Sequence, residues 1–161
     1  MRGRIVSLAL LVFLADLSGR AVCADKEPEE KLPKILTAKP LKPGPKDDEL
    51  RRLLIERYNS AVAEMQARYQ EFLAGKGTLE IFAVGGKRLV ESALELNEKQ
   101  ADQVSLLEQY LELIREIEKI NVSMFEAGRI PKSELELAHY LRIDAEIKLL
   151  RAKRKGNPPK P

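Results

Sequence analysis

The chain has 161 residues, of which 44% are hydrophobic, 33% are charged and only 5% are aromatic. This length allows one domain with one core. A core built mainly from Leu, Ile, Val and Ala suits a helical bundle, whereas a β-sandwich usually needs more aromatic and β-branched residues.

Residues 1–24 have the features of a cleavable export signal. Arg2 and Arg4 form a charged start, and residues 5–14 form an apolar run that is too short to span a membrane comfortably. Small or tolerated residues then precede a cleavage site after Ala24. We therefore expect a periplasmic or secreted protein whose mature chain has no transmembrane span.

A lipoprotein signal is the alternative interpretation, with Cys23 as the lipidated residue, although Arg20 and Val22 argue against it. Cys23 is the only cysteine, so its removal with the signal leaves no disulfide or thiol chemistry. Removal of residues 1–24 also leaves 25 basic and 24 acidic residues. Because that balance is nearly neutral, nothing global indicates a nucleic-acid partner.

Proline placement divides the rest of the chain. Five prolines precede residue 47, three follow residue 157, and only Pro131 lies between them. Because proline removes a hydrogen bond and clashes inside a helix, residues 47–154 are predicted to form the helical domain. Residues 25–46 are predicted to be a proline-rich disordered linker, and residues 155–161 a disordered tail.

Apolar residues recur at three- and four-residue steps, which predicts four helices. The expected ranges are 48–74, 79–96, a third helix that ends near residue 127, and 131–154. Such long helices indicate an all-α fold of antiparallel hairpins or a four-helix, coiled-coil-like bundle. The expected apolar stripes consist of Leu50, Leu54, Tyr58, Ala61, Met65, Tyr69 and Phe72; Leu79, Phe82, Gly86, Leu89, Ala93 and Leu96; Leu106, Tyr110, Leu113, Ile117, Ile120 and Met124; and Leu135, Ala138, Leu141, Ala145, Leu149 and Ala152. Beside the last stripe lie Ile143, Ile147 and Leu150.

Two features modify the second and third helices. Gly85 and Gly86 each weaken a helix by roughly 1 kcal/mol relative to Ala. They indicate either a close approach between helices or a bend. Asn97 is expected to cap the third helix, with Gln100 reaching back to it.

The stretch from Phe125 to Pro131 is expected to reverse the chain between the last two helices. Gly128 accepts the left-handed conformation that closes a helix, and Arg129 is favoured near the unpaired carbonyls there. Pro131 suits the first turn of the next helix. A capping box that begins at Ser133 is an alternative start, a few residues further on.

The earlier turn has a similar sequence, because Phe72-Leu73-Ala74-Gly75-Lys76 parallels Phe125-Glu126-Ala127-Gly128-Arg129. The match suggests a duplicated helix–turn–helix unit. Each turn is either an ordinary connection or an exposed tip that docks a partner. The candidate partner-contact residues are Gly75, Lys76, Gly77, Gly128, Arg129, Ile130 and Pro131.

The second unit resembles the TolC-type outer-membrane efflux protein family, in its helical periplasmic part only. The resemblance covers roughly residues 65–152 and departs from the family pattern at Glu136 and Gly85. In that family such turns join long coiled-coil helices at the periplasmic end of a tunnel, where an adaptor protein docks. The resemblance implies a role in efflux or in protein–protein contact at the cell envelope. The matching residues are Phe125, Gly128, Glu134, Leu135, Ala138 and Ala145.

A second resemblance is local. Leu96-Asn97-Glu98-Lys99-Gln100 is similar to the Leu-Thr-x-x-Gln motif of Spy/CpxP-like periplasmic stress proteins. Asn replaces Thr, and the motif occurs once where that family usually has two. This resemblance implies a stress chaperone or sensor as the alternative function.

Residues for catalysis are scarce. His139 is the only histidine, and it is either a metal ligand with Glu136 or Asp144 or an ordinary packing residue. A single histidine and no mature cysteine provide no nucleophile–base pair, and the glycines follow no strand, so no phosphate loop is predicted. We therefore expect a non-enzyme without cofactor, metal or small-molecule substrate. Its expected partners are an envelope protein or a second copy bound through the helices.

The end of the last helix, from Arg151 onward, is basic. Cations there are favoured by the helix dipole, which explains them without a partner. Contact with an anionic lipid or an acidic partner is the alternative interpretation.

Overall fold

The computed structural model describes residues 32–156. A short 3-10 helix, η1 (Lys34–Thr37), precedes four α-helices: α1 (Glu49–Leu73), α2 (Leu79–Leu96), α3 (Gln100–Glu126) and α4 (Lys132–Gly156). No strand occurs in the described range, so the predicted all-α fold is confirmed. The predicted export signal and the remaining parts of the predicted linker and tail lie outside the described residues.

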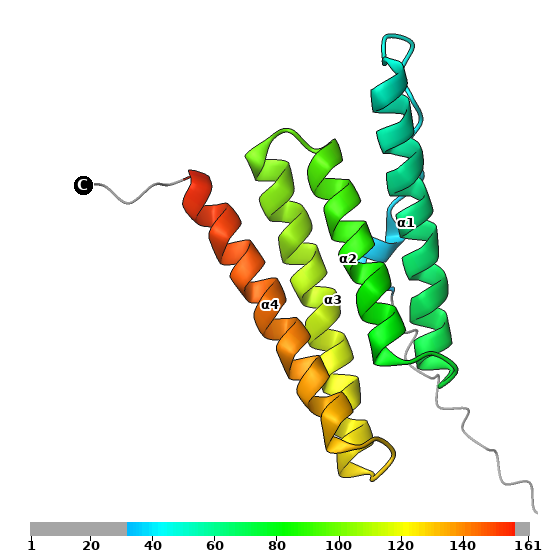
Figure 1. The fold of residues 1–161 in the computed structure, drawn as a ribbon, viewed down its shortest axis with the longest axis vertical. Helices are drawn as coiled ribbons and strands as arrows, with labels where there is room; N and C mark the ends of the chain where they lie inside the picture. The colour runs from blue at the N-terminus through cyan, green and yellow to red at the C-terminus, as the bar shows by residue number, and fades with distance from the viewer. Residues whose placement is uncertain (1–31, 157–161) are drawn as a thin grey trace, which may run out of the picture. The chain divides into compact units, whose positions relative to one another are not determined.

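The helices form two antiparallel hairpins (Figure 1). α1 packs mainly on α2, and α3 packs mainly on α4. α2 also contacts both α3 and α4, so it joins the two hairpins. The α1–α2 and α3–α4 turns lie at one end of the bundle, and the α2–α3 turn lies at the other.

The predicted stripes supply most of the core, because Met65, Tyr69, Leu89, Leu113 and Ile117 are each at most 1% exposed. The Ala138, Ala145 and Leu149 positions of α4 are also buried, which lets α4 lie close to α3. The stripe is wrong at its first position, since Leu50 is 64% exposed. Leu50 lies in the first turn of α1, next to Arg51, which donates to the carbonyl oxygen of Leu96 in the last turn of α2 at 2.6 Å. The start of α1 extends past that end of α2 (Figure 1).

Gly85 and Gly86 are sites of close approach. A Cβ atom at Gly85 would lie 2.8 Å from Met65 Sδ of α1, and one at Gly86 would lie 2.9 Å from the hydroxyl oxygen of Tyr110 of α3. A Cβ atom does not approach another heavy atom so closely, so the Met65 or Tyr110 side chain would have to move. α2 runs unbroken across the pair, so close packing on two sides, rather than a bend, explains the two glycines.

Two of the helices begin at side-chain caps. Thr78 accepts a hydrogen bond from the N–H of Ile81 at 3.3 Å and so caps α2. Asp48 does the same for α1, because its carboxylate accepts from the N–H of Arg51 at 2.7 Å. These bonds pair backbone N–H groups that have no partner inside the helix.

The predicted cap at Asn97 is wrong. Asn97 ends α2, and α3 begins only at Gln100, after Lys99. The amide of Gln100 does not reach back to Asn97 but donates to the carbonyl oxygen of Ala152 near the end of α4. This tertiary bond ties the start of α3 to the last turns of α4, 52 residues away.

The predicted disordered linker is wrong for its described part, residues 32–46. Ile35 and Leu36 of η1 are 2% and 0% exposed and belong to the main core. The N–H of Leu36 donates to the carbonyl of Pro33 at 2.8 Å, which closes the 3-10 turn. The carbonyl of Leu36 accepts from the Gln66 side chain of α1 at 2.6 Å. Two apolar residues thus anchor a segment whose proline content suggested an extended chain.

The segment after η1 is also bound to α1. The side-chain amide of Asn59 accepts from the N–H of Leu41 at 2.9 Å and donates to the Leu41 carbonyl at 2.8 Å. Gly44 then donates to the carboxylate of Asp47 at 2.7 Å, in the turn that leads into α1. Polar side chains therefore provide the hydrogen bonds that this irregular segment does not form with other backbone groups.

α4 begins one residue after Pro131. Ser133 therefore lies inside the helix, and the capping-box alternative is wrong. α4 continues to Gly156, whereas the predicted disordered tail begins at residue 155. The tail prediction is therefore wrong for residues 155 and 156.

Within residues 32–156, none of the helices has the length and the apolar content needed to cross a membrane.

Candidate functional site

The two predicted contact turns have the same backbone structure. Gly75 and Gly128 both have a φ angle of +67°, a conformation that glycine adopts without strain. In each turn the glycine N–H bonds to the carbonyl three residues back, and the next N–H bonds to the carbonyl five residues back, at 2.8 to 3.0 Å. This is the Schellman arrangement. The repeat seen in the sequence therefore corresponds to a repeat in turn geometry.

The two turns line one open cleft of about 510 Å³, here called the tip cleft. They meet because both hairpins turn at the same end of the bundle (Figure 1). The sequence predicted the turns one by one and not the cleft that they share. Of the predicted contact residues, those that line it are Gly75, Gly77, Arg129, Ile130 and Pro131, whereas Lys76 and Gly128 do not.

The tip cleft combines apolar walls with a few polar groups. Phe72 and Met124 contribute apolar surface, and Arg129 and Glu134 provide opposite charges. Asn121 also lines the cleft and is only 1% exposed. Its amide nitrogen donates to the Ile117 carbonyl at 2.8 Å, which holds the side chain against its own helix.

Sequence reasoning missed Asn121. It lies four residues after Ile117 and three before Met124, within the predicted apolar stripe of α3. A single amide in an otherwise apolar stripe was the available signal, because a buried polar group needs a partner and is costly without one.

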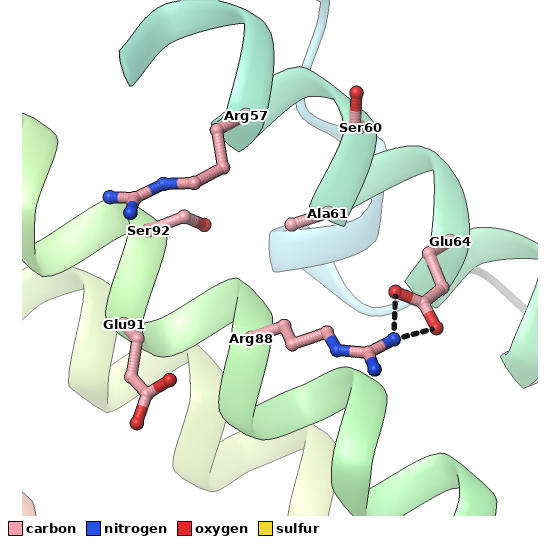
Figure 2. A pocket seen from close by; sticks show the side chains of 7 residues that line it. All are labelled: Arg57, Ser60, Ala61, Glu64, Arg88, Glu91 and Ser92. Atoms are coloured by element: carbon pink, nitrogen blue, oxygen red, sulfur yellow. Dashed lines mark hydrogen bonds and ion pairs between the residues drawn. The ribbon is translucent and has the colours of Figure 1, made fainter. Parts of the chain in front are cut away.

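A second hollow, of about 270 Å³, lies between α1 and α2 (Figure 2). Arg88 of α2 reaches across to both carboxylate oxygens of Glu64 at 2.9 and 3.2 Å. Arg57 forms an ion pair with Glu95, a residue that does not line the hollow. Because both guanidinium groups already bind carboxylates, the hollow offers no unpaired arginine for an anionic ligand. It is lined by Arg57, Ser60, Ala61, Glu64, Arg88, Glu91 and Ser92.

A groove of about 320 Å³ separates α2 from α4. Val84 and Tyr140, which are 47% and 65% exposed, lie along it. The Tyr110 side chain also lines it, and burial, together with the charge of Asp144, raises the Tyr110 pKa to about 12. Tyr110 therefore keeps its hydroxyl proton at neutral pH. Asp144 is paired with Lys148 at 2.8 Å.

His139 belongs to a charge cluster between α3 and α4. Its Nδ1 atom lies 2.7 Å from Glu118 Oε1, and Arg142 Nε donates to the same oxygen at 2.8 Å. Arg142 and Arg115 each donate to Glu146, at 3.0 and 2.9 Å. His139 thus contacts Glu118 of α3, a residue that neither interpretation of His139 included. Within residues 32–156 no group of three or more potential ligands is placed to hold a metal ion.

The contribution of this cluster to stability depends on pH through the Glu118 carboxyl. Burial by itself raises its pKa, but the hydrogen bonds from His139 and Arg142 outweigh burial and hold the pKa below the ordinary value of 4.5. A carboxyl with a lowered folded-state pKa stabilises the fold fully above its unfolded-state pKa. That contribution is lost as the pH falls through the folded-state pKa.

We therefore expect Glu118→Gln to lower the free energy of unfolding by about 1 kcal/mol at pH 6. The difference from wild type should shrink toward zero at pH 3, where wild-type Glu118 is increasingly protonated. Urea unfolding at both pH values measures it. Glu112→Gln, on an exposed part of the same helix, is the control and should have little effect at either pH. An equal loss at both pH values would contradict the assignment.

Fold and site together define an all-α protein of two antiparallel hairpins, with an apolar cleft formed by their turns. No family model, curated protein or solved structure matches this chain.

Proposed function

We propose that this chain is an exported, non-enzymatic helical protein that docks a protein partner at the cell envelope through the tip cleft. The proposal extends the resemblance to the periplasmic helical part of TolC-like efflux proteins. The observation that carries it is the tip cleft itself, because two turns 53 residues apart, Gly75 and Gly128, close with the same geometry and contribute to one apolar surface region.

The chemistry of the cleft suits a protein partner. Its apolar side chains, Phe72, Met124 and Ile130, give a surface that gains from leaving water. Arg129 is exposed and Glu134 is half-buried, so opposite charges lie at positions that steer a partner. The hydrogen bonds that close the turns fix the backbone, which lowers the ordering cost of binding.

Charge reversal at Arg129 tests the docking. Arg129→Glu should leave the free energy of unfolding within ~0.5 kcal/mol, because the side chain is exposed. It should nevertheless reduce capture of the partner several-fold, since a favourable charge is replaced by its opposite. The measurement is co-purification from envelope extract with the tagged full chain, beside thermal melting of the same variants.

Arg52→Glu is the matched control, because Arg52 is exposed on α1 far from the turn that ends it. A partner lost with Arg129→Glu and retained with Arg52→Glu supports the tip cleft as its site. Equal capture by wild type and both variants would refute docking at the turns. The Spy/CpxP-like alternative instead requires that the purified protein suppress aggregation of unfolded clients, and equally so in both variants.

The same preparation tests export. Mass spectrometry should find a protein that begins at Asp25, as expected from cleavage after Ala24. An intact Met1, or a lipid on Cys23, would contradict the expected signal.

A further inference from the structure

α4 carries a second apolar stripe that its own bundle does not cover. Tyr140, Ile143, Ile147 and Leu150 are 65%, 47%, 40% and 55% exposed. They follow one another at steps of three, four and three residues. We call this set the α4 outer seam. The inner stripe of α4, with Ala138, Ala145 and Leu149, is buried.

The spacing of the α4 outer seam is that of a coiled coil. With Ile147 at position a and Ile143 and Leu150 at position d, the seam follows the heptad pattern that brings two helices together. α4 contacts only α2 and α3 among the helices of the bundle, and it lies at the edge of the bundle (Figure 1). The outer seam is therefore accessible to another helix.

From this pattern we propose that a second copy of this chain packs its α4 against the α4 outer seam, with the two helices parallel and in register. The charges beside the seam decide the orientation. In a parallel pair, position g of one helix faces position e of the other, five residues further on. Glu146 then faces Arg151 of the second copy, as a further partner beside Arg115 and Arg142 of its own bundle. His139 faces Asp144, but both already have partners within the bundle, Glu118 and Lys148, so the contact with Arg151 decides the orientation.

The antiparallel arrangement is disfavoured by the same residues. Packing Ile143 against Ile147 of an antiparallel copy brings Glu146 close to its own equivalent, and likewise Asp144. Like charges that face each other across an interface are destabilising. Arg151 is exposed and forms none of the ion pairs found within residues 32–156. It is therefore available to a partner.

The α4 outer seam is short, so the association should be reversible. From residue 140 to residue 150 a helix extends about 15 Å, at 1.5 Å per residue. A stable interface generally buries on the order of 1,200 Å² or more in total. A seam of this length reaches such an area only if the interface also includes the neighbouring α2–α4 groove. A parallel pair places both tip clefts at the same end, and its formation does not depend on the proposed docking function.

The test is the oligomeric state of the protein purified after expression of the full chain. Sedimentation equilibrium should show a mass that rises with concentration from one copy toward two. Leu150→Glu should raise the concentration at which dimers form by at least tenfold. Leu53→Glu is the matched control, since Leu53 of α1 is 56% exposed, against 55% for Leu150. It should leave dimer formation unchanged, and circular dichroism should show that both variants remain helical.

A cysteine at the seam tests the orientation. Ile147→Cys, with Cys23 replaced by Ser, should form a disulfide between copies under oxidation, because parallel helices place the two 147 positions side by side. A crosslink only between Ile143→Cys in one copy and Ile147→Cys in the other would overturn the parallel register.

Other outcomes would overturn the pairing itself. One is a wild-type protein that remains monomeric at every concentration, and another is an equal effect of Leu150→Glu and Leu53→Glu. A third is a monomer that binds phosphatidylglycerol vesicles through the seam, with binding lost in Leu150→Glu. That result would assign the α4 outer seam and the basic end of α4 to a membrane surface.

Discussion

Leu113→Ala is expected to lower the free energy of unfolding by roughly 2–5 kcal/mol. Leu113 lies in the middle of α3, is 0% exposed and belongs to the main core. Truncation removes apolar contacts and leaves a cavity that the surrounding helices fill only in part. Chemical denaturation followed by circular dichroism measures the change.

Leu53→Ala is the control for this substitution. Leu53 is 56% exposed on α1, so the same chemical change should alter the free energy of unfolding by no more than ~0.5 kcal/mol. A loss below 0.5 kcal/mol for Leu113→Ala itself would mean that the α3 stripe is not the core of the folded protein.

Leu36→Ala should have an effect of similar size, roughly 2–4 kcal/mol, although Leu36 belongs to a proline-rich segment. Its side chain is 0% exposed, and η1 contacts both α1 and α3. Loss of this side chain therefore opens a cavity between two helices that do not otherwise form a major contact. Urea unfolding of the variant beside wild type measures the effect.

Leu41→Ala is the matched control within the same segment, because Leu41 is 45% exposed and is held through its backbone. It should leave stability nearly unchanged. If Leu36→Ala were equally neutral, residues 32–46 would not be part of the folded domain, and the original linker prediction would be restored.

The helices and turns were predictable because their signals are local. Thr78 and Gly128 occupy the positions expected of a helix cap and a helix-closing glycine, and the range of α2 matches the prediction. Each such signal depends on hydrogen bonds between residues three to five positions apart. The apolar stripes are similarly local, since a helical period of 3.6 residues decides which positions share a face.

The same local reasoning failed where a residue had a better distant partner. Gln100 was expected to bond near Asn97, but its amide instead reaches the carbonyl of Ala152, 52 residues away. Leu36 was assigned to a linker because its neighbours are proline and lysine, yet it is buried in the core. Composition within a short window carries no information about which distant surface is left to fill.

By itself, the sequence determined that this protein is all-α, where its helices turn, and most of the residues that form the main core, because these follow from periodicity and from contacts between near neighbours. Only the tertiary structure decided that the turns at Gly75 and Gly128 share one cleft, that Leu36 completes the core, and that the α4 outer seam stays exposed within residues 32–156. These features depend on how the two hairpins pack. That packing depends on the close approach of α2 to α3 at Gly86 and on contacts between side chains far apart in the chain.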